Sequence, residues 1–265
     1  EGDEYAYNAI TSPDRLGNYT QIFRDSFIIS RTQETVDEAG NIQKRRYQKL
    51  KTGIALRKDV ELAIVTNNAS VGGATRELGG LPTWIETNAV RGAGGSNGGF
   101  DINTGLTVAA TNGTQVAFTQ ALMDDVMKQG YESGANYRNV YVSPYVNPVF
   151  DGFMSNADVA NFRYAVSDGH RNSIISNADI YEGPYGKVVI KPNRVMSTAA
   201  TARNAFFVDT SMASFLWLRK LAEDTDVTRT GDAEKVVIVG EGTLKVSNEA
   251  GLGVVADIFG MSATT

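Results

Sequence analysis

The sequence contains no cysteine, which excludes disulfide bonds, thiolate metal sites and cysteine nucleophiles. Its single histidine, His170, excludes a metal site built from several histidines of one chain. Long apolar runs are also missing. The longest window without a charged residue, Ile102 to Met123, carries five Thr, two Asn and two Gln, which are costly in lipid. The sequence therefore predicts no membrane span.

Basic residues are in the minority, with 25 Lys and Arg against 30 Asp and Glu and a net charge of −5. This balance argues against a dedicated nucleic-acid binder. Proline is scarce, with 6 residues, whereas glycine accounts for 27 of 265 residues. That is roughly 10%, against about 7% in average proteins. The combination predicts many turns and flexible loops in a folded chain rather than Pro-rich disorder.

The first eighteen residues are acidic, polar and without clear periodicity, as is typical of an extended arm. The next run, TQIFRDSFIISRTQETV, interleaves Phe23, Phe27 and Ile29 with polar residues and predicts a strand. A turn-like DEAGN follows, and we expect IQKRRYQ to return as a second strand, with the tip of the hairpin near Gly40. An isolated hairpin is marginal in water, so this one needs a partner surface.

Helical spacing follows from Tyr47 to Ala69 and predicts the longest helix of the chain. Its expected stripe, mostly apolar, consists of Leu50, Ile54, Glu61, Leu62 and Val65. A glycine-rich region then runs from Gly72 to Gly105, and a loop of this length is functional, mobile or ordered by a neighbour.

A second helix is predicted from Gln115 to Ser133, where Gly134 fits a C-terminal stop. Its expected main face carries Phe118, Leu122, Val126 and Gln129, with Met123, Met127 and Tyr131 beside it. The second half of the chain is mixed, with one helix expected at Asn156 to Val166. Its strand-like runs are YRNVYVSP, GKVVIKP, NAFFVDT, SFLWLRKLA, EKVVIVGEGTLKVSN and LGVVADIFGM.

Catalytic motifs are nearly absent. The segment GGSNG, from Gly94 to Gly98, matches G-x-S-x-G, but that motif exposes a nucleophile only between a strand and a helix. Here glycines flank it, which favours a flexible loop over a hydrolase site using Ser96 and His170. Asp224 and Asp226 form a D-x-D pair, yet arginine stands where a calcium loop needs glycine.

The strongest charge feature is a basic cluster made of Lys44, Arg45, Arg46, Lys49 and Lys51. Such a cluster is either a solvated junction between a strand and a helix or an electrostatic contact with an acidic neighbour. The acidic arm, with Glu1, Asp3 and Glu4, is one candidate neighbour, and the net charge favours protein over nucleic acid. Together with an arm and a hairpin that cannot bury themselves, this suggests a subunit that completes its fold against other copies.

The order of these elements resembles the major capsid protein of tailed bacteriophages, which has the Hong Kong 97-type fold. More narrowly, it is similar to the shorter capsid proteins typified by phage SU-ten. The segments that carry the resemblance are NYTQIFRDSFIISRTQE, KLKTGIALRKDVELAIV, GLPTWIETN, VYVSPYVNPVFDGF, IYEGPYGKVVIKPNRVM, FFVDTSMASFLWLR and VSNEAGLGVVADI. They span most of the chain, and the specificity lies in their order and spacing.

The resemblance implies an α+β fold in five parts. These are an N-arm at 1–17, an E-loop hairpin at 18–46 that lies over an adjacent subunit, a P-domain with a long spine helix and the glycine-rich loop at 47–135, an A-domain at 136–221, and a C-terminal return to the P-domain at 222–265. The start at Glu1 rather than Met is expected of a shell protein from which a maturation protease removes an N-terminal segment.

The resemblance also implies a structural protein that is not an enzyme and has no catalytic residue, cofactor or metal. Its copies would form hexamers and pentamers of an icosahedral head that encloses double-stranded DNA without sequence-specific binding. Portal, decoration or cement, and scaffolding proteins are the implied partners, the virion is the implied location, and assembly takes place in the host cytoplasm, away from membranes. Candidate inter-subunit contacts are Phe23, Phe27, Ile29, Arg31, Lys44, Arg45, Arg46 and Trp84.

Two other function classes stay open on the residues alone. A serine hydrolase would use Ser96 and His170, and replacing Ser96 with alanine would abolish its activity. A β-rich surface adhesion module would be a soluble monomer that binds a glycan or receptor, and it has no use for the long hairpin.

Overall fold

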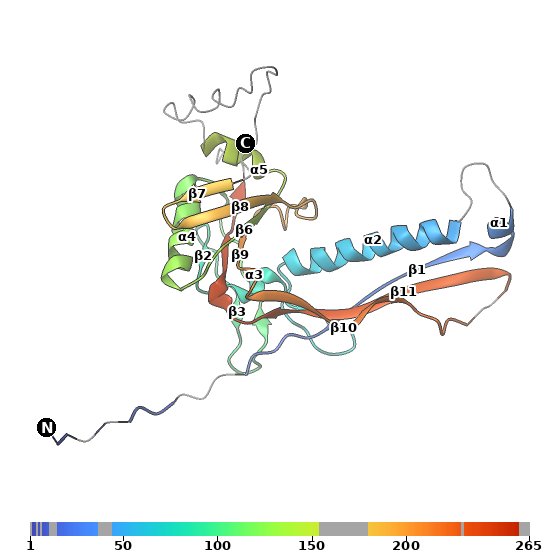
Figure 1. Ribbon diagram of the computed structural model, residues 1–265, viewed down its shortest axis with the longest axis horizontal. Helices are drawn as coiled ribbons and strands as arrows, with labels where there is room; N and C mark the ends of the chain where they lie inside the picture. Colours follow the sequence, from blue (N-terminus) through green and yellow to red (C-terminus); the bar gives the residue numbers. More distant parts are fainter. Residues whose placement is uncertain are drawn as a thin grey trace, which may run out of the picture.

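The computed structural model describes residues 2–3, 5, 7–10, 15–36, 44–153, 180–228 and 231–259. Figure 1 shows two regions, a body and an elongated excursion that projects from it. The excursion consists of a three-stranded sheet and the long helix α2 (Lys44–Val65), which runs alongside the sheet (Figure 1). The described residues between 2 and 10 lie on the side of the body opposite to the excursion (Figure 1).

The sheet of the excursion has the order β1-β11-β10. Its strands are β1 (Gln21–Ser30), β10 (Ala213–Glu223) and β11 (Ala233–Val246). The central strand β11 is antiparallel to both neighbours, and β1 pairs with it from Gln21 opposite Gly242 to Ser30 opposite Ala233. All three strands are rich in the β-branched and aromatic residues that fit a pleated, half-buried surface. The predicted strands in these three segments are therefore confirmed.

The predicted return strand IQKRRYQ is wrong. A short helix, α1 (Arg31–Thr35), follows β1, and α2 already begins at Lys44. Lys, Arg and Gln are good helix formers, and β11 offers Val236 and Ile238 on the face that Phe23 and Phe27 share. The partner of β1 is therefore a strand some two hundred residues away, while the expected tip near Gly40 lies outside the described residues.

Helix α2 begins at Lys44 rather than Tyr47 and ends at Val65 rather than Ala69. It packs on the sheet through Thr52, Leu56 and Val60, which follow one another at the helical spacing of four. The predicted stripe lies largely on the outside, because Leu50, Ile54 and Leu62 are exposed. The helix carries apolar residues on two opposite faces, and periodicity alone does not tell which face meets the sheet.

The body is built around a six-stranded sheet with the order β2-β12-β9-β6-β8-β7. The pair β6–β8 and the pair β12–β2 are parallel, and the other neighbours are antiparallel. The predicted strand runs in this part of the chain are confirmed. The bounds are β2 (Ala89–Val90), β6 (Asn139–Val142), β7 (Ile180–Gly183), β8 (Gly186–Pro192), β9 (Ala205–Val208) and β12 (Leu252–Val255).

Helix α4 (Gln120–Glu132) covers the body sheet through Met123, Val126 and Met127. It begins five residues later than predicted, because β5 (Val116–Ala117) pairs with β13 (Ile258–Phe259) and the Thr119 side chain caps the helix. Helix α5 (Asn147–Phe153) also lies over this core. The helix expected at Asn156 to Val166 lies outside the described residues.

The glycine-rich region folds against the base of the excursion rather than forming a separate domain. It contains the short helix α3 (Leu81–Trp84), and β3 (Gly99–Phe100) pairs with β4 (Thr107–Val108). A single 3-10 turn, η2 (Glu249–Gly251), leads into β12. One hydrophobic cluster joins α2, the excursion sheet, α3 and the body sheet, so the two regions share a packed root.

Candidate assembly surface

The apolar residues predicted to contact other subunits lie mostly inside the chain. Phe23, Ile29 and Trp84 are buried, and Phe27 is half-buried against the cluster at the root of the excursion. The Trp84 ring meets Phe100 edge-on, with 5.1 Å between ring centroids. Within one copy, Phe23, Phe27 and Trp84 belong to the cluster that joins the excursion to the body, and Ile29 is buried near the outer end of β1.

The residues of the basic cluster fall into two groups: those that form ion pairs within the chain and those that lie nearer to solvent. Arg45 Nη2 lies 2.7 Å from Glu223 Oε1, and its Nη1 lies 2.9 Å from Glu234 Oε1. Lys49 Nζ lies 2.6 Å from Glu223 Oε2. These hydrogen bonds from Lys49 and Arg45 lower the pKa of the Glu223 carboxyl. The start of α2 is thereby tied to the far ends of β10 and β11, which fixes the outer part of the excursion.

The other predicted cations lie nearer to solvent. Arg31 Nη1 is 3.7 Å from Asp232 Oδ1, and both side chains are mostly exposed, so this pair adds little stability. Arg46 and Lys51 are exposed on α2, and Lys44 is partly exposed at its first residue. Of the predicted basic contacts, Arg46 and Arg31 thus remain most open to a second molecule.

A network at the base of the excursion was not predicted from the sequence. The buried Glu241 carboxylate accepts hydrogen bonds from Thr20 Oγ1 at 2.7 Å, Arg219 Nη2 at 2.9 Å and Arg76 Nη2 at 3.1 Å. The hydrogen bond from Thr20, followed by the contributions of Arg219 and Arg76, lowers the pKa of Glu241. These contacts join the residue before β1, the 71–77 loop, β10 and β11 at the base of the excursion.

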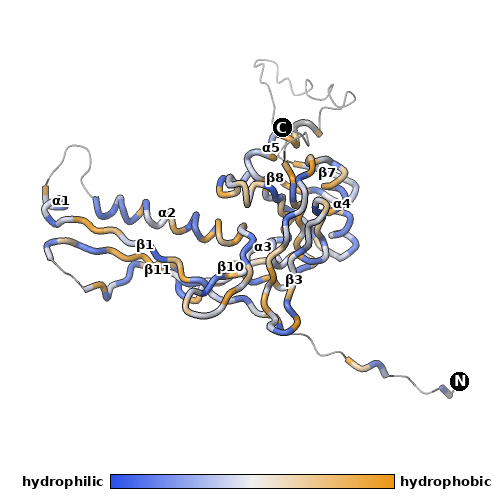
Figure 2. Tube along the Cα trace, turned by 180° about the vertical axis from the view of Figure 1, so that it is seen from behind, coloured by the Kyte–Doolittle hydropathy of each residue, from blue (hydrophilic) through white to orange (hydrophobic). Residues whose placement is uncertain are grey.

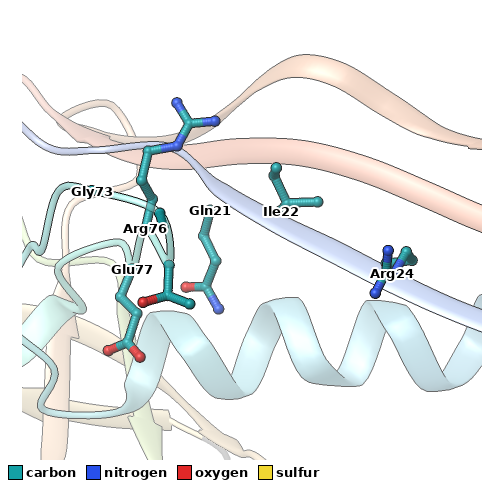
Figure 3. A pocket seen from close by; sticks show the side chains of 8 residues that line it. Gln21, Ile22, Arg24, Gly73, Arg76 and Glu77 are labelled. Atoms are coloured by element: carbon teal, nitrogen blue, oxygen red, sulfur yellow. The ribbon is translucent and has the colours of Figure 1, made fainter.

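The same base carries an open hollow of about 760 Å³ between β1 and the 73–77 loop (Figure 3). It is lined by Gln21, Ile22, Arg24, Gly73, Ala74, Thr75, Arg76 and Glu77. In Figure 3 the labelled residues of the hollow come from β1 and from the 73–77 loop.

Asp257 organises the glycine-rich loops from inside the body. Its carboxylate accepts hydrogen bonds from the backbone N–H groups of Gly92 and Gly113, at 3.3 and 2.9 Å, and from Arg203 Nη2 at 2.5 Å. A Cβ on Gly92 would lie 1.8 Å from the Thr114 carbonyl oxygen, so only glycine allows this approach. The glycine-rich loop is therefore ordered by contacts within its own chain. Neither this ordering nor the role of Asp257 was predicted from the sequence.

The alternative hydrolase site gains no support from the local geometry. Ser96 is exposed and exchanges backbone hydrogen bonds with Thr111, and the turn that carries it lies in a loop rather than between a strand and a helix. His170 lies outside the described residues.

Among the described residues, no group of three or more His, Asp or Glu side chains is arranged to hold a metal ion. The helices within this part of the chain are all too short or too polar to cross a membrane.

Among the described residues, large apolar side chains are exposed at several places, three of which lie on the excursion and the arm. Figure 2 shows that apolar stretches continue along the excursion as well as through the body. On the outer face of α2, Tyr47, Leu50 and Ile54 are each more than half exposed. On the sheet face turned away from α2, the open residues include Ile22 and Ile28 of β1. The third set, Tyr5, Tyr7 and Ile10, lies on the arm.

The edges of the excursion sheet are also unequal. β10 has two register shifts along its pairing with β11, whereas β1 pairs without interruption over its whole length. Bulges blunt an edge strand against further pairing, and a regular edge leaves its outer backbone groups available. The excursion thus presents open apolar faces and one regular edge, a combination typical of an element that is completed by another molecule.

Comparison with known proteins bears directly on this surface. A family model described as SU10 major capsid protein matches residues 1–259. The capsid of a native GTA particle has a similar structure, with 14% identity and a TM-score of 0.58 over 98% of this chain and 81% of that chain. The holo-SrpI encapsulin complex from Synechococcus elongatus gives 9% identity and a TM-score of 0.57, covering 93% of this chain and 75% of that chain.

The capsid asymmetric unit of cyanophage A-1(L) gives 15% identity and a TM-score of 0.51, covering 90% of this chain and 77% of that chain. No curated protein matches the sequence. At such low identities the likeness shows the fold alone, and it confirms the predicted Hong Kong 97-type architecture.

Proposed function

The chain belongs to the SU10 major capsid protein family, and from that premise we propose that its copies assemble through the excursion into a closed icosahedral shell. The protein is thus a bacteriophage structural protein and a component of the virion. In the proposed shell, hexamers and pentamers of this chain enclose double-stranded DNA.

The observation that carries the proposal is the open excursion. Its sheet is covered by α2 on one face only, and the outer face of α2 is itself apolar. Burying such surfaces is favourable, at about 25 cal/mol per Å² of apolar area removed from water. Each contact between neighbours is modest, but a closed shell repeats it many times, and multivalency makes the whole assembly stable.

We keep the five-part division as part of this proposal, with one refinement. The N-arm is 1–17, the P-domain begins with the spine helix, and the A-domain and C-terminal return follow at 136–221 and 222–265. The refinement is that the projecting element comprises β1, β10, β11 and the first half of α2, and is not limited to 18–46. The element that reaches a neighbour therefore draws on both ends of the chain.

Further partners follow from the same proposal. A shell of this kind works with portal, scaffolding and decoration or cement proteins, and it assembles in the host cytoplasm. A net charge of −5 suits a wall that encloses DNA without clamping its phosphates. Contacts to the genome are accordingly independent of its sequence.

The test is the native mass of the purified protein, measured by analytical ultracentrifugation and viewed by negative stain. We expect capsomers or shells in the megadalton range. A chain that stays at 28.5 kDa under all assembly conditions would overturn the proposal. Replacing Ser96 with alanine serves as the control, because assembly does not depend on that exposed hydroxyl.

A further inference from the structure

Positive charge is concentrated on a single element of the chain, helix α2. Its 22 residues include seven basic and two acidic ones, which gives the helix a net charge of +5. The whole chain carries −5, so the residues outside α2 together carry −10. The modest net charge of the chain therefore conceals a strong polarity between one basic helix and an acidic remainder.

The fold leaves more than half of the cations of α2 without an anion. Arg45 and Lys49 form ion pairs with glutamates of the excursion sheet, and Lys44 also has an interaction partner. The other four are exposed, and within the described ranges none of them forms a salt bridge: Arg46, Lys51, Arg57 and Lys58. Four charged side chains of one helix are therefore available to an anionic partner.

These four cations form two rows along the outer face of α2. Lys51 and Lys58 are seven residues apart, close to two full turns, so they share one side of the helix. Arg46 and Arg57 are eleven residues apart, close to three turns, and form the second row. At 1.5 Å per residue, the rows span about 18 Å, a length over which duplex DNA carries about ten phosphate charges. Between the rows lies the exposed apolar strip of Tyr47, Leu50 and Ile54.

The positive surface continues from the excursion onto the body. Asn193 Nδ2 donates to Glu61 Oε1 at 2.7 Å, so the turn that follows β8 meets the last part of α2. Lys191 and Arg194 flank Asn193 in the sequence, and both are exposed. Two further cations thus lie close to the end of the rows.

We infer that the outer face of α2 binds the phosphates of double-stranded DNA without regard to base sequence, and that this face turns toward the genome in the proposed shell. The inference rests on the proposed function, which brings duplex DNA to one side of the wall. It adds which side of the chain that is.

The composition of the face favours phosphates over a protein partner. Lysine is depleted in protein–protein interfaces, whereas Lys and Arg clustered on one face or along a helix are the footprint of nucleic-acid binding. Contacts of this kind are weak, with dissociation constants of about 10⁻⁴–10⁻⁶ M at physiological salt. Weak binding by each copy agrees with a wall that encloses the genome without clamping it.

Salt-dependent binding of a short DNA duplex tests the inference. A fluorescently labelled duplex is titrated with the full, unassembled chain, and its anisotropy is followed between about 50 and 200 mM salt. With four phosphate contacts, the logarithm of the binding constant should fall by about 3.6 per unit of log salt concentration, since each contact contributes about 0.9. A second duplex of unrelated sequence should bind equally well.

A charge-neutralising variant locates the binding on α2. Lys51→Gln combined with Lys58→Gln removes one row, and should weaken binding at low salt at least about tenfold and reduce the salt slope by about 1.8. The matched control is Lys220→Gln combined with Lys245→Gln, which removes the same charge from two exposed lysines of β10 and β11. It should change the affinity by less than about twofold.

The outcomes separate this inference from the proposed function. Equal losses in the two double variants would show that DNA responds to overall charge, and would overturn the assignment to α2. A Lys51 and Lys58 variant that binds DNA like wild type but no longer assembles would show that protein covers this face, which also overturns it. Wild-type chains that form shells but do not bind the duplex at low salt overturn the inference alone. Chains that bind the duplex but never assemble overturn the proposed function alone.

Discussion

Strand β9 of the body and strand β1 of the excursion both carry large apolar side chains, but their surroundings are opposite. All four residues of β9 are buried, whereas only two of the ten residues of β1 are, Phe23 and Ile29. Body strands such as β9 lie between a helix layer and other strands, while β1 is an edge strand covered on one face. The body therefore buries its apolar strands within one copy, whereas the excursion leaves part of its apolar surface exposed.

The two regions also use charge differently. In the body, a fully buried carboxylate, Asp257, is paired with Arg203 and two backbone N–H groups. In the excursion, Glu241 at the base is nearly buried and Glu223 near the tip is partly open. Carboxylates thus become more exposed with distance from the body, and their expected contributions to stability decrease in the same order.

The largest effect is expected from the packed core of the body. Phe207→Ala removes a fully buried ring that packs against Tyr137, and should lower the free energy of unfolding by about 3–5 kcal/mol. Ile28→Ala, on the open face of β1, should change it by less than about 0.5 kcal/mol. Urea unfolding of the unassembled chain measures both values. Comparable losses from the two substitutions would contradict the contrast between body and excursion.

The next effect concerns the buried ion pair. Asp257→Asn preserves the volume of the side chain, and asparagine tolerates the backbone φ of 60° at this position. The substitution removes the negative charge that pairs with Arg203. Breaking a buried pair in this way should cost about 3 kcal/mol. Thermal unfolding gives the loss, and hydrogen exchange should become faster at the Gly92 and Gly113 amides. Unchanged exchange at these two amides would show that Asp257 does not hold the loops.

A smaller, pH-dependent effect is expected at the base of the excursion. Glu241→Gln should cost about 1.5–3 kcal/mol near neutral pH, because hydrogen bonds to a charged group are lost. Thr20, Arg219 and Arg76 lower the pKa of Glu241 below its ordinary value of 4.5. A carboxyl group whose pKa is lower in the folded chain than in the unfolded chain stabilises the folded chain at pH values above the unfolded-state pKa. This stabilisation is lost as the pH falls through the folded-state pKa. The difference between wild type and variant should therefore be constant above pH 4.5 and shrink below it.

Glu223→Gln is the matched control for this measurement. It removes the same charge from the same sheet, but at a more exposed pair, which is worth about 0–1 kcal/mol and is screened by salt. A larger loss at Glu223 than at Glu241 would reverse the proposed gradient from body to tip.

Local features were predictable from the sequence, and long-range ones were not. Helix α2 and strands such as β8 and β11 followed from periodicity, because each pattern is complete within its own segment. The pairing of β1 with β11 joins Gln21 to Gly242, and no local signal marks a partner so distant. The expected return strand was wrong for that reason.

The candidate assembly surface shows the same difference between local and long-range features. The basic cluster was found, since its members are consecutive in sequence, but the glutamates that pair with Arg45 lie far along the chain. The apolar stripe of α2 was identified correctly as a stripe and assigned to the wrong side, because Leu56 and Val60 form a second one. The partners of Asp257 and Glu241 depend on the tertiary fold, so composition and spacing carried no sign of them.

The central position of β11 also orders events during synthesis. Among the described residues, β1 and β10 each pair with this strand alone. Roughly 200 residues separate it from β1, so at about 5–20 residues per second β1 waits about 10–40 s for its partner. A nascent or truncated chain cannot close the sheet. The synthesis of β11 is therefore a checkpoint, and only a chain that has reached this strand carries the complete projection.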